Sequence, residues 1–243
     1  GFDTGLKHPV AFLDLGFNRI SYQGAGHLAH ALHLNESLTY LDIRSNQLGD
    51  AGGVALSKAL CDPDYESYLQ SLIESGAGDS APSVESGGTG QSSSSLSQVE
   101  FLRRYKRNTG LTYLNLVSNS LGQLCCRHLC EVLKMNSTLV ALDLAFNPML
   151  GSHEVKTLAN FIRLYSPPIE VLSVGQMVFG DDVSAAFAKV LALEDTRLRT
   201  LALPRNRLLS TSAKRLAQSL VRNTVLTSLA LPQNPLGSKG AGY

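Results

Sequence analysis

Tryptophan is absent from this chain, and no apolar run approaches the roughly 18 residues of a membrane-spanning helix. The sequence also lacks the GxxxxGKS/T loop that binds nucleotide phosphates, and it has no GxGxxG turn after a predicted strand. We therefore predict a protein with no membrane span, no nucleotide and no other small-molecule cofactor.

The cysteines do not follow a disulfide or zinc pattern. Three of the four lie within six residues and two of those are adjacent, so there is no CxxC spacing. Cys126 and Cys130 fall where other copies of the repeat described below place small or core residues, and we interpret both as core residues. This cysteine usage suits a reducing compartment, which predicts a cytoplasmic protein.

The sequence contains no arrangement that predicts catalysis or metal binding. His27, His30 and His33 are spaced three apart, but on a helix the first and third point about 120° away from each other. Cys125 and His128 are close in sequence without a third residue to orient the base. We therefore predict a protein that is not an enzyme and holds no metal.

Charge is unevenly distributed although the formal net charge is only +1. Residues 62–100 carry seven acids and no Lys or Arg, whereas residues 189–243 carry nine Lys or Arg and two acids. Such a basic end can meet an acidic partner or nucleic acid, or it can be a solvated face. No base-stacking aromatics accompany it, which argues against nucleic acid. The basic end consists of Arg197, Arg199, Arg205, Arg207, Lys214, Arg215 and Arg222.

One phrase, L-x-x-L-x-L-x-x-N-x-L, recurs along the chain. LTYLDIRSNQLG at residues 38–49 and LTYLNLVSNSLG at residues 111–122 are identical at eight of twelve positions. We call the residue at the Asn position of each copy its anchor. The spacings between successive anchors are 28, 73, 28, 30, 29 and 28 residues. The anchors are Asn18, Asn46, Asn119, Asn147, Met177, Asn206 and Asn234.

Each copy predicts a short strand followed by a helix. Apolar residues alternate before the anchor, as Leu41 and Ile43 do, which is typical of a strand. Ten and fourteen positions after the anchor most copies place Leu, as at Leu56 and Leu60, and a gap of four is helical. One such unit cannot bury its apolar face alone, so the units must stack on one another.

The anchor Asn predicts a structural role. Its amide carries donors and an acceptor, which can satisfy buried backbone groups where the chain leaves the strand. Met177 cannot do this, so we predict a locally irregular fifth turn. The predicted Asn ladder comprises Asn18, Asn46, Asn119, Asn147, Asn206 and Asn234.

This pattern resembles the leucine-rich-repeat proteins, and among them the ribonuclease-inhibitor-like class with repeats of about 28 to 29 residues. The resemblance covers nearly all of the chain except residues 62–100. It implies an α/β solenoid of about seven repeats. A curved parallel sheet would form the concave side, and α-helices would form the convex side.

The long spacing between Asn46 and Asn119 divides the repeats. Residues 1–61 contain the first two repeats, residues 62–100 an acidic Ser/Gly-rich insertion loop, and residues 101–243 five more repeats of the same solenoid. Tyr40 and Tyr113 should then lie side by side. The last copy stops before the Leu expected ten positions after its anchor, so we expect its helix to be absent and the solenoid to be truncated there.

Strand residues that alternate with the buried ones should face outward on the concave side. The N-terminal half of this face is aromatic and acidic, which suits a protein contact, and the C-terminal half is small. An Asp beside a strand Leu can equally serve the fold locally, and a convex or edge contact stays open. The candidate partner-binding residues are Phe12, Asp14, Tyr40, Asp42, Arg44, Tyr113, Asn115 and Asp143.

These features predict a non-enzymatic protein-interaction or scaffold module whose partners are other proteins. We expect a structural subunit of a larger intracellular assembly in the cytoplasm, with the cytoskeleton and the cilium as candidate locations. The resemblance to leucine-rich-repeat proteins implies two alternatives. One is a GTPase-activating protein of the Ran-directed type, and the other is a ligand-sensing or inhibitor domain.

Overall fold

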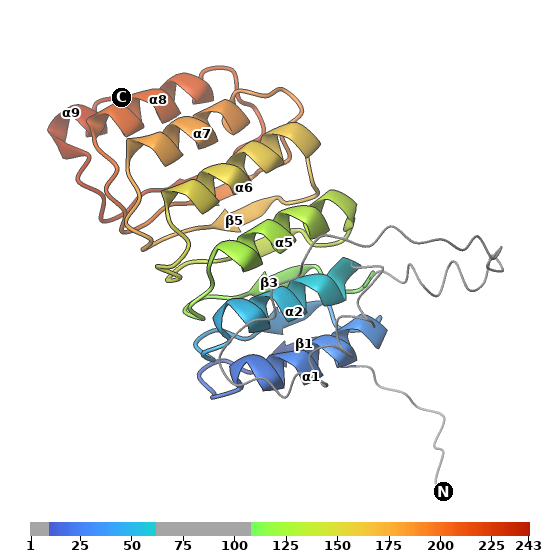
Figure 1. Ribbon diagram of the computed structural model, residues 1–243. Coiled ribbons are helices and arrows are strands. Elements are labelled where there is room, and N and C mark those ends of the chain that lie inside the picture. The colour runs from blue at the N-terminus through green and yellow to red at the C-terminus, as the bar shows by residue number, and fades with distance from the viewer. Residues whose placement is uncertain (1–9, 62–107) are drawn as a thin grey trace, which may run out of the picture.

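The computed structural model describes residues 10–61 and 108–243, in which short strands alternate with helices (Figure 1). The strands are β1 (Phe12–Asp14), β2 (Tyr40–Asp42), β3 (Tyr113–Asn115), β4 (Ala141–Asp143), β5 (Val171–Ser173), β6 (Thr200–Ala202) and β7 (Ser228–Ala230). The helices are α1 (Ser21–Leu34), α2 (Gly49–Cys61), α5 (Gln123–Met135), α6 (Ser152–Tyr165), α7 (Asp181–Leu191), α8 (Ser210–Leu220) and α9 (Gly237–Ala241).

The seven strands form one parallel sheet in chain order, from β1 to β7. The helices stack in the same order along one side of this sheet (Figure 1). β2 pairs directly with β3, so Tyr40 lies opposite Tyr113 although 73 residues separate them. The predicted solenoid and the predicted adjacency of these two tyrosines are confirmed. The predicted insertion at residues 62–100 lies outside the described residues.

The alternating apolar residues of the strands are buried between the sheet and the helices. Leu41, Ile43 and Leu114 have no exposed surface, and burying such a side chain contributes about 1.5–3 kcal/mol. In the last strand Leu229 is only half-buried, because a repeat at the end of the described stack has one neighbour to pack against.

Neighbouring helices approach closely where a repeat carries a small residue seven positions after its anchor. A Cβ on Gly53 would lie 2.5 Å from Cys125 Sγ and 2.6 Å from Leu121 Cδ2, so only glycine lets α2 come this near α5. Cys126 and Cys130 are 3% and 6% exposed, which confirms their assignment to the core.

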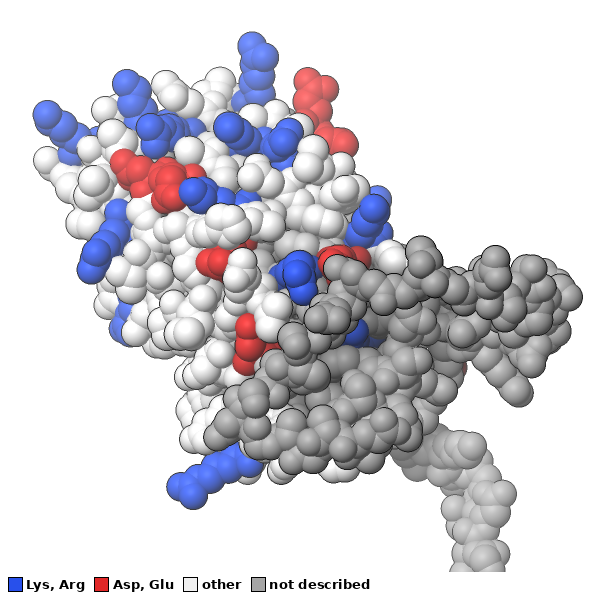
Figure 2. Space-filling view, in the orientation of Figure 1, with Lys and Arg blue, Asp and Glu red and all other residues white. Residues whose placement is uncertain are grey.

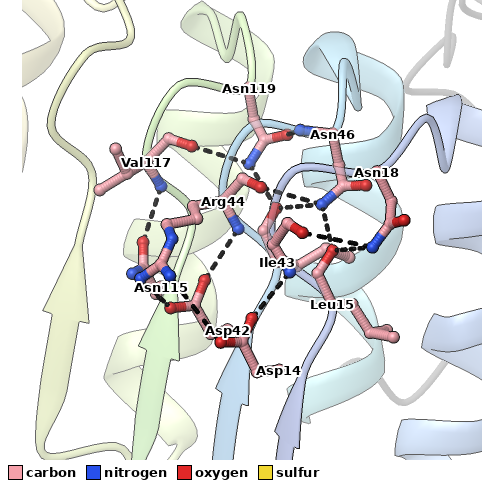
Figure 3. A network of polar contacts seen from close by, with 11 residues as sticks. Asp14, Leu15, Asn18, Asp42, Ile43, Arg44, Asn46, Asn115, Val117 and Asn119 are labelled. Atoms are coloured by element: carbon pink, nitrogen blue, oxygen red, sulfur yellow. Dashed lines mark hydrogen bonds and ion pairs between the residues drawn. The ribbon is translucent and has the colours of Figure 1, made fainter.

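The side-chain amides of the anchors form a ladder that closes the turns after the strands (Figure 3). Asn119 Oδ1 accepts the backbone N–H of Asn46 at 2.9 Å, and Asn119 Nδ2 donates to the carbonyl oxygen of Ile43 at 2.9 Å. Asn119 therefore satisfies backbone groups of the preceding repeat. Equivalent bonds come from Asn147, Asn206 and Asn234.

The residue before each anchor adopts a left-handed backbone, which costs roughly 1–2 kcal/mol for a residue with a Cβ. The residues with this positive φ are Phe17, Ser45, Ser118, Phe146, Gln176, Arg205 and Gln233. In some repeats the residue after the anchor also has a positive φ, as at Gln47, Ser120 and Val178. The backbone N–H of the residue before the anchor donates to a carbonyl oxygen of the next repeat, as in Ser45 to Val117 and Ser118 to Ala145.

Met177 interrupts the ladder without disturbing its turn. Gln176 and Val178 have φ values of 53° and 59°, close to the 56° and 55° of Ser118 and Ser120 around Asn119. β5 stays in register with both of its neighbours. The predicted irregularity of the fifth turn is therefore wrong. The next repeat still holds the turn from outside, because Asn206 Oδ1 accepts the backbone N–H of Met177 at 3.0 Å.

A second amide ladder, which the sequence reading missed, runs along the opposite edge of the sheet. Asn108 Nδ2 donates to the carbonyl oxygens of Leu32 and Asn35 at 2.8 and 2.7 Å, and Asn108 Oδ1 accepts the N–H of Leu111 at 2.8 Å. The signal was an Asn three residues before the first Leu of a copy. It occurs at Asn35, Asn108, Asn136 and Asn223.

The last described turn contains a short helix where none was expected. α9 spans five residues, and its Gly240 is buried against α8, with a Cβ built there only 3.3 Å from the Ser210 Cα. The expectation that this helix is absent is therefore wrong, because one helical turn needs no Leu ten positions after the anchor. No helix within residues 10–61 and 108–243 is long and apolar enough to cross a membrane.

Replacing Asn119 by Ala should destabilise the fold by about 3 kcal/mol, because several buried backbone groups would lose their partner. The urea-denaturation midpoint measures this loss. Asn18→Ala is the matched control: Asn18 is an exposed anchor whose amide bonds only within its own turn. Equal midpoints for the two variants would contradict a ladder that couples repeats.

Candidate interaction site

Three aromatic rings stack across the first positions of β1, β2 and β3. The ring centroids of Phe12 and Tyr40 are 4.1 Å apart, and those of Tyr40 and Tyr113 are 4.3 Å apart with nearly parallel planes. Stacked pairs contribute about 0.5–1.5 kcal/mol beyond the area they bury. Phe12 stays 60% exposed. We call Phe12, Tyr40 and Tyr113 the aromatic strip.

The aromatic strip changes the titration of its innermost member. The pKa of Tyr113 rises from 10.0 to about 12, mainly because burial disfavours the phenolate and also because Tyr40 stands beside it. Asp143 and Asp42 add repulsion that disfavours the phenolate. Tyr113 is therefore a neutral phenol at physiological pH.

A row of acids and amides lies next to the aromatic strip and ends the strands. Their side-chain oxygens accept the backbone N–H two residues further on, at 2.8–3.0 Å, which is the geometry of an Asx turn. The sequence left open whether these residues bind a partner or serve the fold locally, and these bonds show that they have a local role in the fold. The residues in this row are Asp14, Asp42, Asn115 and Asp143.

Arg44 ties part of this row together (Figure 3). Its Nη1 lies 2.8 Å from Asp42 Oδ2 and its Nη2 lies 3.8 Å from Asp14 Oδ2. Asn115 Nδ2 also donates to Asp42 Oδ2 at 3.0 Å. The guanidinium carbon stands 5.3 Å from the centre of the Phe17 ring, within cation–π range.

The burial of Asp42 and Asn115 corrects the predicted set of outward-facing residues. The Asp42 side chain is 1% exposed, and Asn115 is 5% exposed. Both have committed their polar atoms to neighbouring groups, so they support the face rather than offer it to a partner. Asp14 keeps 46% of its side chain exposed.

Asp143 lies further along the same row, at the end of β4. Burial raises the pKa of its carboxyl, although hydrogen bonds from Ala145 and Ser173 oppose that shift. Beyond it the face loses its aromatic character. The first positions of β4 to β7 are Ala141, Val171, Thr200 and Ser228.

The predicted basic end does not form one patch. Arg197 and Arg199 precede β6 and Arg205 and Arg207 follow it, so the two pairs lie on opposite edges of the sheet. Arg199 also pairs with Glu170 at 3.1 Å. Figure 2 shows Lys and Arg scattered over the helices of the C-terminal half, with acids between them. Arg222 follows α8, on the edge where β7 begins.

The cysteine thiols of α5 are poor candidates for a catalytic nucleophile. Burial raises the pKa of the Cys125 thiol well above its usual range, so it stays protonated and weakly nucleophilic. Within residues 10–61 and 108–243, no group of three or more His, Cys, Asp or Glu residues is placed to hold a metal ion.

Known proteins share the repeat pattern of this chain. A family model described as "Leucine Rich repeat" matches residues 34–57. Human "NACHT, LRR and PYD domains-containing protein 13" is 32% identical over 182 residues, covering 66% of this chain and 17% of that protein. Human "NACHT, LRR and PYD domains-containing protein 14" is 28% identical over 243 residues, covering 97% of this chain and 20% of that protein.

The chain thus spans about a fifth or less of the length of these two relatives. One solved structure, "Leiomodin-1 Actin-Binding Site 2 (ABS2)", superposes with a TM-score of 0.46 at 14% identity, covering 68% of this chain and 69% of that one.

Replacing Asp42 by Ala should lower stability by about 3 kcal/mol, because Arg44 and Asn115 would lose a charged acceptor. Asp14→Ala, in the same row but exposed, should cost less than about 1 kcal/mol. Thermal unfolding of both variants measures the difference. A small loss for Asp42→Ala would restore that residue as a candidate for direct partner contact.

Because of Tyr113, the free energy of unfolding should fall as the pH rises from 10 to 12. In this range the unfolded chain releases the phenol proton while the folded chain keeps it, so ionisation favours the unfolded state. Tyr113→Phe removes this loss. Urea midpoints at pH 9 and pH 11.5 measure it, and an equal alkaline loss in wild type and variant would contradict the raised pKa.

Proposed function

The chain is a leucine-rich-repeat protein, and on that premise we propose that it is a non-enzymatic protein-binding module that receives its partner on the aromatic strip. The observation that carries the proposal is the continuous stack of Phe12, Tyr40 and Tyr113 on the sheet face, of which Phe12 is 60% exposed.

The geometry of the aromatic strip suits tight protein contact. Aromatic side chains dominate the binding energy of protein interfaces. These three are mounted on paired strands and stacked on one another, so little side-chain freedom remains to be lost when a partner binds. Next to them, the buried Asp42 is fixed by Arg44 and Asn115, and its bond to Asn115 links the two neighbouring strands β2 and β3.

The charge beside the strip favours a partner with basic groups at its rim. Arg44 pairs with Asp14 and Asp42, and Asp143 lies further along the same row, opposite Asn115. Asp14 is the exposed member of the set and can meet a Lys or Arg of the partner. Such rim charges tune association rate and specificity more than affinity.

The names of the relatives bear on which kind of protein contains this module. The names of the relatives place their leucine-rich repeats beside NACHT and PYD domains, which favours a partner-sensing repeat module within such a protein. The structural subunit of a ciliary or cytoskeletal assembly and the Ran-directed GTPase-activating activity stay predictions. No contact among residues 10–61 and 108–243 favours either of them.

The triple variant Phe12→Ala, Tyr40→Ala, Tyr113→Ala should abolish binding of the partners that the wild-type chain enriches. Affinity purification with quantitative mass spectrometry measures this loss. The matched control is Val171→Ala, Thr200→Ala, Ser228→Ala, which truncates the same strand position outside the strip. Circular dichroism must show that both variants fold. If the strip variant keeps every partner that the control keeps, the concave site is wrong.

A further inference from the structure

Three bulky side chains at the edge where the strands end hold a backbone conformation that their residue types avoid, and we call this edge the turn edge. Phe17 and Phe146 precede the anchors Asn18 and Asn147, Val178 follows the anchor Met177, and all three have φ of 59°. The Phe17 ring packs against the Arg44 guanidinium, which leaves Phe146 and Val178 to be explained. Bulky and β-branched residues rarely occupy the left-handed region. Other repeats place Ser118 and Ser120 at these turn positions. Residues held in such conformations cluster at functional sites.

Packing in the core does not account for these two residues. Phe146 is 40% exposed and Val178 is 52% exposed, and Met149, three residues after Phe146, is 68% exposed. The backbone N–H of Phe146 donates to the carbonyl oxygen of Gly175 at 2.9 Å, so the fourth turn lies directly against the fifth. The fold thus places strained, apolar side chains at the surface of adjacent turns.

Two arginines of the sixth turn border these apolar side chains. The backbone N–H of Arg207 donates to the carbonyl oxygen of Phe179 at 2.9 Å, which puts Arg207 beside Val178. Arg205 donates from Nη1 to Gln176 Oε1 at 3.3 Å and from Nε to Gln233. Both arginines are exposed. The turn-edge patch consists of Phe146, Met149, Val178, Arg205 and Arg207.

We propose that the turn-edge patch is a second interaction surface, which binds an acidic amphipathic segment of a partner protein. Phe146, Met149 and Val178 would contact its apolar side chains, and Arg205 and Arg207 its carboxylates. The two glutamines hold the Arg205 guanidinium in place, which suits the paired hydrogen bonds of a carboxylate. Recognition of anionic lipid instead uses clusters of about four to eight flexible Lys or Arg residues.

Thermal stability provides the first test, because the left-handed conformation strains Phe146 and Val178. Asn tolerates the left-handed region better than Phe or Val. The double variant Phe146→Asn, Val178→Asn should therefore keep or raise the Tm, by up to about 4 °C. The matched control Ser118→Asn, Ser120→Asn changes the same turn positions outside the patch. If the Tm of the double variant falls below that of the control, the two residues serve the fold and the proposal is overturned.

Binding gives the second test, using fluorescence anisotropy on the full chain. The probe is a 16-residue helical peptide with Leu and Phe on one face and Glu on the other, and its counterpart carries Lys in place of Glu. The Glu peptide should bind, and the double variant should weaken that binding about tenfold. Arg207→Gln should weaken it and reduce its salt dependence, and the Ser118→Asn, Ser120→Asn control should bind like wild type.

Several binding results would also overturn the proposal. The Glu peptide could fail to bind, or it could bind no better than the Lys peptide. The double variant could bind the Glu peptide as wild type does. Alternatively, vesicles of phosphatidylcholine and phosphatidylserine could bind the chain while the Glu peptide does not, which would assign the patch to a membrane surface. The single variant Phe12→Ala should leave Glu-peptide binding unchanged, so this test is independent of the binding site proposed on the aromatic strip.

Discussion

The structure depends on hydrogen bonds to the backbone N–H and C=O groups of the turn that follows each strand. These turns are too short to pair all of these groups within themselves. The strands are only three residues long, so the chain leaves the sheet while it is still buried. Each unpaired backbone group at that depth would cost about as much free energy as the burial of one leucine contributes. The anchor amides resolve this on one edge, and Asn35, Asn108, Asn136 and Asn223 resolve it on the other. Because most of these bonds reach the neighbouring repeat, the same contacts that close the turns also stack the solenoid.

The same constraint decides which residues of the sheet face are available to a partner. Asp42 and Asn115 occupy outward strand positions, yet their polar atoms are used to end strands and to hold Arg44. The aromatic strip escapes this use because its residues stand at the start of their strands, away from the turn. A single face therefore combines the buried polar groups of Asp42 and Asn115 with a stack of rings that runs from the exposed Phe12 to the half-buried Tyr113.

The recurring turn also determines which side chains are exposed at the turn edge. The residue before the anchor is in the left-handed region, and its backbone N–H donates to a carbonyl oxygen of the next repeat, as Ser118 does to Ala145 and Phe146 to Gly175. Where that residue is Ser118 the edge is polar, and where it is Phe146 the edge is apolar at a cost in backbone strain. The concave face and the turn edge are thus separate surfaces produced by one recurring turn.

The sequence by itself determined the repeat period, the order of strands and helices, the anchors and the adjacency of Tyr40 and Tyr113. Those features follow from patterns within a single repeat, and residue spacing records them directly. Only the tertiary structure decided that Asp42 is buried and that the turn at Met177 stays regular. Both depend on contacts between repeats, because an amide of the next repeat, that of Asn115 or of Asn206, supplies what the local sequence lacks.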